Sequence, residues 1–260
     1  MKIASNGIRI HVEEQGRGEP PLVFLHYWGG SSCTWRHVTA ALAPSHRTIA
    51  LDHRGWGQSD APAGGYGLAD LADDAQGVIR ALGLRHYVLV GHSMGGKVAQ
   101  LLASRRPAGL VGLVLMAPSP PQPMALPDKA RAMMACAYES RASVEATIDH
   151  VLTAKPLSPR DREQVIADSL RGAPPAKAAW PNATSLEDIR DVVGAIDVPT
   201  LVIAGEADRV DTVDLLRAEL LPRIPQATLH VLPGTGHLSM LESPGEVARL
   251  IADFTRALNR

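Results

Sequence analysis

The sequence has 260 residues, of which 45% are hydrophobic, so the chain is long enough for one α/β domain with a full core and an insertion. Its net charge is −1, from 26 Lys and Arg against 27 Asp and Glu, without a long run of one sign. This balance excludes the basic surface of a protein that binds nucleic acid or an anionic membrane. A small neutral molecule is the expected partner.

No targeting or membrane segment is evident. Residues 1–7 lack the apolar stretch of a secretory signal, and no run of roughly 18 apolar residues occurs in the chain. We therefore expect a cytoplasmic protein. Cys33 and Cys136 lack the spacing of a metal site or a redox pair, so both are expected to be small buried side chains without a disulfide.

Strands and helices alternate over residues 1–116. The alternation of apolar and polar residues at 8–13 predicts an edge strand, whereas uninterrupted apolar runs predict strands covered on both faces. These buried strands are expected at residues 22–25, 48–51, 87–90 and 110–116. Helices are expected between them at 35–42, at 68–82 and through 98–102 as far as Pro107. The alternation predicts a doubly wound, mostly parallel sheet of the α/β class.

The alternation stops at residues 118–197, where Ala, Met, Pro and helix-forming residues dominate. Helices are expected there at 127–140, at 144–154 with Ser143 as N-cap, and from Ser158 to Gly172, with prolines punctuating the rest. The sheet resumes with strands at 200–204 and 228–232 and helices at 212–221 and 244–258. We expect a core domain formed by 1–117 and 198–260, with 118–197 as a helical cap.

The candidate nucleophile lies where the apolar residues 88–90 run into Gly91-His92-Ser93-Met94-Gly95. A Gly-x-Ser-x-Gly pattern between a strand and a helix predicts a tight turn that lifts the serine hydroxyl above the sheet edge. The amide of Met94 would then lie at a helix N-terminus, where unpaired N–H groups bind anions. In a chain with 23 glycines, such a pattern can occur by chance. The predicted strand before it and helix after it are what favour a catalytic turn over a chance match.

A serine needs a base and a group that orients the base. Of the ten histidines, His237 is preferred because Gly234-Thr235-Gly236-His237 directly follows a predicted strand, whereas His26 and His92 are interpreted as structural. Asp208 follows the strand at 200–204 and is the preferred acid. Glu206 and Asp211 remain open by position.

These three motifs together resemble the α/β-hydrolase superfamily over nearly the whole chain. The resemblance implies Ser93, Asp208 and His237 as a catalytic triad, because the order Ser, acid, His and the motif position of Asp208 match that family. It also implies the backbone amides of Trp28 and Met94 as oxyanion donors, although Tyr27 replaces the usual glycine. Residues 52–60 resemble a structural loop of the family. Neither a metal nor a cofactor is implied.

The resemblance implies a serine hydrolase that cleaves carboxylic esters of small, largely apolar substrates through an acyl-enzyme on Ser93. A lactonase, a C–C bond hydrolase and a cofactor-free perhydrolase or haloperoxidase are alternatives within the fold, and a noncatalytic binder is the alternative outside enzymes. A serine nucleophile disfavours epoxide hydrolases and haloalkane dehalogenases, and Gly29 in place of proline disfavours perhydrolases. The residues expected to line the pocket are Tyr27, Met133, Met134, Tyr138 and Trp180.

Overall fold

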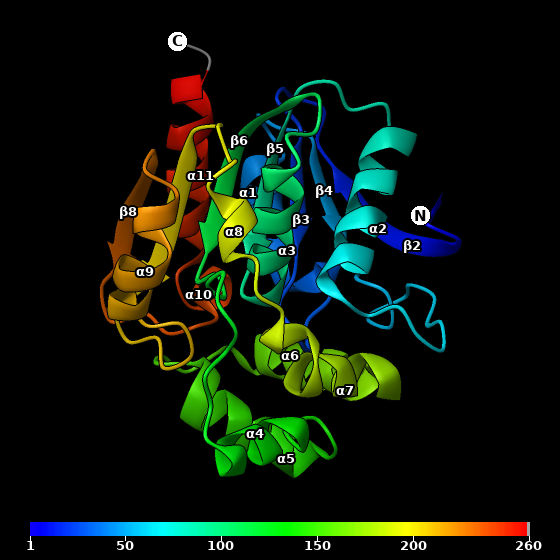
Figure 1. Ribbon diagram of the computed structural model, residues 1–260, viewed down its shortest axis with the longest axis vertical. Helices are drawn as coiled ribbons and strands as arrows, with labels where there is room; N and C mark the ends of the chain where they lie inside the picture. Colours follow the sequence, from blue (N-terminus) through cyan, green and yellow to red (C-terminus); the bar gives the residue numbers. More distant parts are fainter. Residues whose placement is uncertain (259–260) are drawn as a thin grey trace.

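The computed structural model describes residues 1–258, and eight strands of this part of the chain form one sheet (Figure 1). The strands, in chain order, are β1 (Lys2–Ser5), β2 (Ile8–Gln15), β3 (Leu22–Leu25), β4 (Thr48–Leu51), β5 (Tyr87–His92), β6 (Leu110–Met116), β7 (Thr200–Gly205) and β8 (Ala227–Leu232). They lie in the order β1-β2-β4-β3-β5-β6-β7-β8. The pairs β1–β2 and β2–β4 are antiparallel, and every other neighbouring pair is parallel.

Helices cover both faces of this sheet. On one side α1 (Arg36–Leu42) packs against α11 (Pro244–Leu258), and on the other α3 (Met94–Ser104) packs against α2 (Leu68–Ala81) and α8 (Arg190–Val193). Two shorter helices follow β7 and β8, namely α9 (Val213–Glu219) and α10 (Ser239–Glu242). Every residue of β3, β4, β5 and β7 is buried, because these strands are covered on both faces. The predicted doubly wound, mostly parallel sheet is confirmed.

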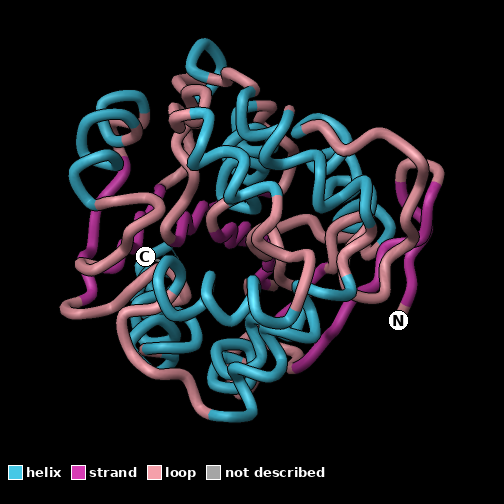
Figure 2. The backbone as a smooth tube through the Cα atoms, turned by 90° about the horizontal axis from the view of Figure 1, so that it is seen from below, coloured by secondary structure: helices cyan, strands magenta, loops and turns pink. Residues whose placement is uncertain are grey.

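A helical insertion, residues 118–197, separates β6 from β7 although these strands are neighbours in the sheet. Its main helices are α4 (Asp128–Ala135), α5 (Arg141–Thr147), α6 (Pro159–Arg171) and α7 (Pro174–Asn182). In Figure 1 they lie below the sheet, with α6 and α7 nearer to it than α4 and α5. Figure 2 is viewed from that side and shows helices and loops in front of the strands. The insertion therefore lies over the edge where the parallel strands end.

Strand β1 was not predicted. It pairs with β2 through a tight turn at Asn6 and Gly7, whose φ angles are 47° and 79°. An Asn-Gly pair is the preferred sequence of a two-residue hairpin turn, because both positions need positive φ. The Asn6-Gly7 dipeptide is therefore the feature of the sequence from which this hairpin could have been predicted.

Two helix boundaries in the insertion were predicted wrongly. The helix expected at 127–140 ends at Ala135, and the next one begins at Arg141 rather than at residue 144. Ser140 is the N-cap of α5, because its side chain accepts a hydrogen bond from the Ser143 amide. Pro174 and Pro175 were expected to lie outside helices, but they form the start of α7, since proline fits the first turn of a helix.

Candidate active site

Ser93 occupies the sharp turn between β5 and α3 with φ 52° and ψ −116°. Such angles are costly for a residue with a Cβ and occur mainly where the surrounding structure imposes them. Backbone crowding explains the two flanking glycines, because a Cβ on Gly91 would lie 2.4 Å from the Gly95 carbonyl oxygen, and one on Gly95 would lie 2.5 Å from the His26 carbonyl oxygen. The turn thus places Ser93 at the C-terminal edge of the sheet, where the residue is 7% exposed.

His237 lies on the loop after β8, and its Nδ1 is 2.8 Å from Oδ2 of Asp208, which follows β7. The carboxylate accepts this hydrogen bond, so Nδ1 carries the proton and Nε2 keeps its lone pair in the neutral ring. The amides of Val210 (2.7 Å) and Asp211 (3.2 Å) donate to the other oxygen of Asp208 and fix its orientation. Burial lowers the pKa of His237, but the charge and hydrogen bond of Asp208 outweigh it, and the pKa lies above its usual value.

The two rival acids make other contacts. Glu206 accepts a hydrogen bond from the Gly234 amide at 2.8 Å. Asp211 is buried beside the pair, and within residues 1–258 its Oδ2 has no hydrogen-bond partner. Burial raises the pKa of Asp211 to about 7. Of the three candidates, Asp208 is the one that is hydrogen-bonded to the imidazole.

His92 contacts His237 through both its ring and a hydrogen bond to the backbone. Its Nε2 donates to the His237 carbonyl oxygen at 2.9 Å, and the centres of the two rings are 4.7 Å apart. Burial lowers the pKa of His92 well below its usual value, so the ring is neutral. Within residues 1–258, Ser93 Oγ makes no hydrogen bond to His237. In many enzymes without substrate the contact between nucleophile and base is long, and it tightens when substrate binds.

The candidate oxyanion donors are the backbone amides of Trp28 and Met94. Neither amide donates to an acceptor in the part of the chain that the structure describes. Met94 is the first residue of α3, so its N–H is one of the unpaired groups at the start of that helix. Two unpaired amides therefore follow the ends of two adjacent parallel strands, β3 and β5.

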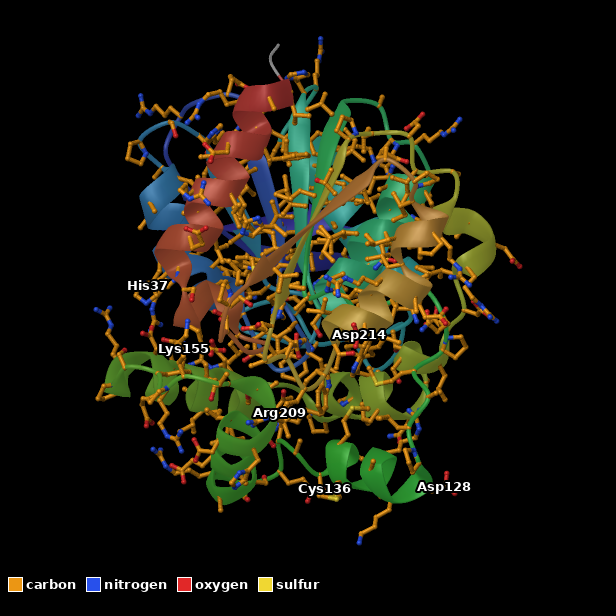
Figure 3. All side chains as sticks on the ribbon, turned by 90° about the vertical axis from the view of Figure 1, so that its left-hand side faces the viewer. His37, Asp128, Cys136, Lys155, Arg209 and Asp214 are labelled. Carbon is orange, nitrogen blue, oxygen red and sulfur yellow. The ribbon has the colours of Figure 1, made fainter. Side chains whose placement is uncertain are left out.

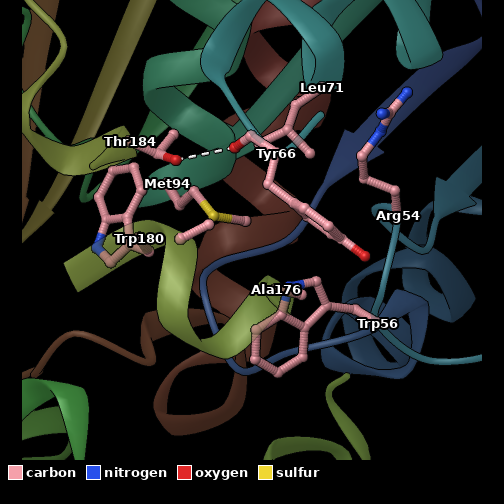
Figure 4. A pocket seen from close by; sticks show the side chains of 9 residues that line it. Arg54, Trp56, Tyr66, Leu71, Met94, Ala176, Trp180 and Thr184 are labelled. Carbon is pink, nitrogen blue, oxygen red and sulfur yellow. Dashed lines mark hydrogen bonds between the residues drawn. The ribbon is translucent and has the colours of Figure 1, made fainter. Parts of the chain in front are cut away.

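An aromatic cavity lies next to the Met94 side chain (Figure 4). Its lining residues are Arg54, Trp56, Tyr66, Leu71, Met94, Ala176, Ala179, Trp180 and Thr184. The cavity volume is about 10 Å³, close to the minimum that a single water molecule needs. Arg54 forms a bidentate ion pair with Asp74, with both N–H···O distances at 2.6 Å. The positive charge of Arg54 is therefore balanced by Asp74.

The model of the alpha/beta hydrolase fold family matches residues 20–244 of this chain. The chain belongs to this family. It is 29% identical to the AB hydrolase superfamily protein YisY of Bacillus subtilis over 96% of both chains.

Solved structures agree with the family assignment. An esterase from Exiguobacterium antarcticum superposes with a TM-score of 0.90, 25% identity and 98% coverage of each chain. Est816, described as an N-acyl homoserine lactone degrading enzyme, superposes with a TM-score of 0.83, 31% identity, and coverage of 98% of this chain and 100% of its own. Other matched proteins bear the names enol-lactonase and non-heme chloroperoxidase. The hydrolase fold is thus shared by proteins with several reactions.

The residues predicted to line the pocket of this hydrolase lie in different places. Trp180 lines the cavity, whereas Tyr138 is buried against Trp28 and Tyr27 against His92. Met134 is half-buried and packs on the core. Met133 is 67% exposed and is not among the residues that line this cavity. The reason is that α4 buries none of its residues and Met133 faces solvent.

Cys136 was expected to be buried, yet it is exposed just after α4, and Figure 3 places it on the side of the insertion away from the sheet. Both cysteines are free.

Within residues 1–258, no group of three or more His, Cys, Asp or Glu side chains is arranged to hold a metal ion. Among the helices of the described chain, none combines the length and the apolar character needed to span a bilayer.

Some cavity residues were not anticipated. Trp56 and Tyr66 lie between β4 and α2, in and after the segment that was interpreted as a structural loop. Their only signal in the sequence was that the loop follows a strand and therefore lies at the same edge of the sheet as Ser93.

Proposed function

We propose that this hydrolase cleaves carboxylic esters of small, largely apolar substrates through an acyl-enzyme on Ser93. The observation that carries the proposal is the 2.8 Å hydrogen bond between His237 and Asp208 at the sheet edge where the β5–α3 turn presents Ser93. An oriented imidazole and a serine on a strained turn are the components of nucleophilic acyl transfer.

The proposed reaction has two stages. Ser93 Oγ attacks the ester carbonyl carbon while its proton passes to Nε2 of His237, and the carbonyl oxygen becomes an oxyanion facing the amides of Trp28 and Met94. The tetrahedral species then expels the alcohol, which takes the proton from His237. Water attacks the acyl-enzyme with His237 again as base, and the acid leaves as Ser93 regains its proton. Asp208 stabilises the imidazolium in both stages.

The insertion is proposed to act as a cap on the core formed by 1–117 and 198–260. It supplies Trp180, Ala176 and Ala179 to the wall of the cavity next to Met94. A closed aromatic wall excludes water from the oxyanion and limits the size of the group bound there.

Lactone hydrolysis is the second candidate. It is favoured by the likeness to Est816, whose description names N-acyl homoserine lactones, at 31% identity over nearly the whole chain. A lactone is an internal ester, so the same serine, imidazole and amides serve both reactions. The two functions differ only in whether the leaving alcohol stays attached to the acyl group.

The test uses p-nitrophenyl acetate, homoserine lactones and a serine-directed phosphonate. Wild-type protein is expected to hydrolyse the ester and to be labelled at Ser93 alone. Ser93→Ala is expected to fold normally by circular dichroism and to lose at least about 1,000-fold in kcat, because no other nucleophile lies on the turn. Activity retained in this variant, or labelling at another residue, contradicts the proposal. A higher kcat/KM for lactones than for open esters selects the second candidate.

A further inference from the structure

The loop that follows β3, residues 26–31, is held by the helical insertion through hydrogen bonds from several positions. The pairs are Tyr138 Oη with Trp28 O (2.9 Å), Ser169 Oγ with Gly29 O (3.0 Å), Ser31 Oγ with Asp168 Oδ2 (2.8 Å) and Trp28 Nε1 with Lys177 O (3.2 Å). A loop is usually the most mobile part of a domain. Here contacts with the insertion hold one side of it.

Tyr138 makes the most extensive of these contacts. Its ring is buried, lies 4.2 Å from the Trp28 ring between centres, and meets Trp56 edge-on at 6.3 Å. The backbone of Gly29 packs directly under it, because a Cβ on Gly29 would lie 2.4 Å from the Tyr138 ring. Burial raises the pKa of Tyr138, so the phenol remains a neutral donor. Its own carbonyl oxygen accepts a hydrogen bond from Lys177 Nζ at 2.9 Å.

The core holds the preceding peptide from the opposite side. Nε2 of His26 accepts from the His53 amide at 2.9 Å, so its Nδ1 carries the proton and donates to the Tyr27 carbonyl oxygen at 2.7 Å. Burial lowers the pKa of His26 to about 4, which keeps the ring neutral. In a trans peptide the Tyr27 carbonyl and the Trp28 N–H point in opposite directions. Fixing the carbonyl therefore sets the direction of the Trp28 amide.

We propose that Tyr138 is a positioning residue, whose phenol fixes the Trp28–Gly29 peptide and so holds in place the residue whose own amide, aimed by His26 through the preceding peptide, faces the oxyanion. The inference rests on the proposed function, in which that amide is an oxyanion donor. His26 fixes one peptide of Trp28 and Tyr138 fixes the other, and only the second contact comes from the insertion. Docking of the insertion is thereby coupled to the geometry of the oxyanion site.

The test is Tyr138→Phe, which keeps the ring and removes the hydrogen bond to Trp28 O. Loss of a whole oxyanion donor costs roughly 100- to 1,000-fold in kcat, so a misaligned donor is expected to cost about 10- to 100-fold, with KM changed less than about threefold. The affinity for a trifluoromethyl ketone, which forms an oxyanion on Ser93, should fall by the same factor. The pH midpoint of kcat/KM should stay unchanged, because His237 is not touched.

Tyr87→Phe is the matched control. The Tyr87 hydroxyl is also buried but has no hydrogen-bond partner in residues 1–258, and Tyr87 begins β5, at the end of the strand away from Ser93. This variant should keep the wild-type kcat and the wild-type affinity for the ketone. A loss in Tyr138→Phe that the control shares would reflect removal of a buried hydroxyl in general and would overturn the proposal.

An NMR measurement separates this inference from the proposed function. In protein labelled with ¹⁵N-tryptophan, Tyr138→Phe should shift the Trp28 backbone amide resonance, whereas Tyr87→Phe should leave it unchanged. An unchanged Trp28 amide overturns the positioning role. A shifted amide with kcat and ketone affinity within twofold of an active wild type also overturns it. A wild type without esterase or lactonase activity refutes the proposed function, and the amide then still decides whether Tyr138 fixes this peptide.

Discussion

At the scale of single residues, the contact between His237 and Asp208 determines which nitrogen of the imidazole is left for Ser93, the proposed nucleophile. Both side chains are buried, and a carboxylate that accepts the hydrogen bond from Nδ1 leaves Nε2 free to take a proton. The same carboxylate stabilises the positive charge that the ring gains. Asp208 therefore fixes the tautomer of His237 and places a negative charge beside it, whereas neither Glu206 nor Asp211 is hydrogen-bonded to the imidazole.

Asp208→Asn is expected to lower kcat by about 10⁴-fold while the fold is retained, because an amide at this position favours the wrong tautomer of His237. Hydrolysis of p-nitrophenyl acetate measures the change. Glu206→Gln is the control and should stay within about threefold of wild type, since Glu206 contacts the Gly234 amide and not the imidazole. A larger loss in Glu206→Gln than in Asp208→Asn would show that the acid is assigned wrongly.

The pH dependence of kcat/KM follows from the raised pKa of His237. The base works only when neutral, so activity should fall as the pH decreases through a midpoint above the usual histidine value of about 6.5. Removal of the Asp208 charge removes a cause that raises this pKa. The residual activity of Asp208→Asn should therefore have its midpoint at lower pH, and a midpoint that moves upward would contradict this account.

At the scale of elements, helix α7 sets the size of the cavity next to Met94. The helix opens at Pro174, and its residues Ala176, Ala179 and Trp180 line the cavity together with Met94. Figure 4 shows Trp180 beside Met94. Two alanines let the helix approach closely, and the indole of Trp180 then fills the remaining space. We therefore propose that the insertion contributes to selectivity without contributing to the proposed triad.

Trp180→Ala should shift the preferred p-nitrophenyl ester toward longer acyl chains, because the removed indole leaves a space that methylene groups fill. Each additional buried CH₂ contributes about 0.8 kcal/mol, or roughly fourfold in kcat/KM. Met133→Ala is the control, and its chain-length profile should match wild type since Met133 faces solvent. Labelling of Ser93 by phosphonate should persist in both. An unchanged profile in Trp180→Ala would show that the acyl group binds elsewhere.

At the scale of the whole molecule, Glu242 joins the insertion to the loop that carries His237. Its Oε2 accepts hydrogen bonds from the amides of Ala154 (3.0 Å) and Lys155 (2.8 Å) in the insertion and of Gly236 (3.1 Å) next to His237. Lys155 Nζ adds contacts to Thr235 and Ser243. On the neighbouring loop Arg209 reaches the His150 carbonyl oxygen, and Figure 3 shows Lys155 and Arg209 where the insertion meets the core.

Glu242→Ala is expected to lower the free energy of unfolding by about 1–3 kcal/mol, because three backbone amides lose their acceptor. In a chain of this size that corresponds to a decrease in Tm of roughly 2–4 °C per kcal/mol, measurable by calorimetry. Glu246→Ala is the control, since Glu246 forms an exposed ion pair with Arg249. The control should change stability by less than about 0.5 kcal/mol. Equal Tm values for the two variants would show that Glu242 does not stabilise the junction.

Much of the fold could be predicted because its signals are local. Strands buried on both faces must be apolar throughout, so β3, β4 and β6 were predicted with the bounds that the structure has. The Ser93 turn was equally predictable, since glycines are needed at Gly91 and Gly95 wherever the chain turns this sharply. Boundaries within the insertion were less predictable, because the serines at 140 and 143 are both suitable N-caps; in the structure Ser140 is the cap and Ser143 completes a capping box with it.

The sequence by itself determined the α/β architecture, the position of Ser93 and a short set of candidate acids and bases. Only the tertiary structure showed which acid is hydrogen-bonded to His237, which side chains line the cavity and which residues Tyr138 contacts. The physical reason is distance along the chain. The hydrogen bond between His237 and Asp208 joins residues 29 positions apart, and that between Tyr138 and Trp28 joins residues 110 positions apart. Such pairs depend on how the loops pack over the sheet edge, and no local pattern specifies that packing.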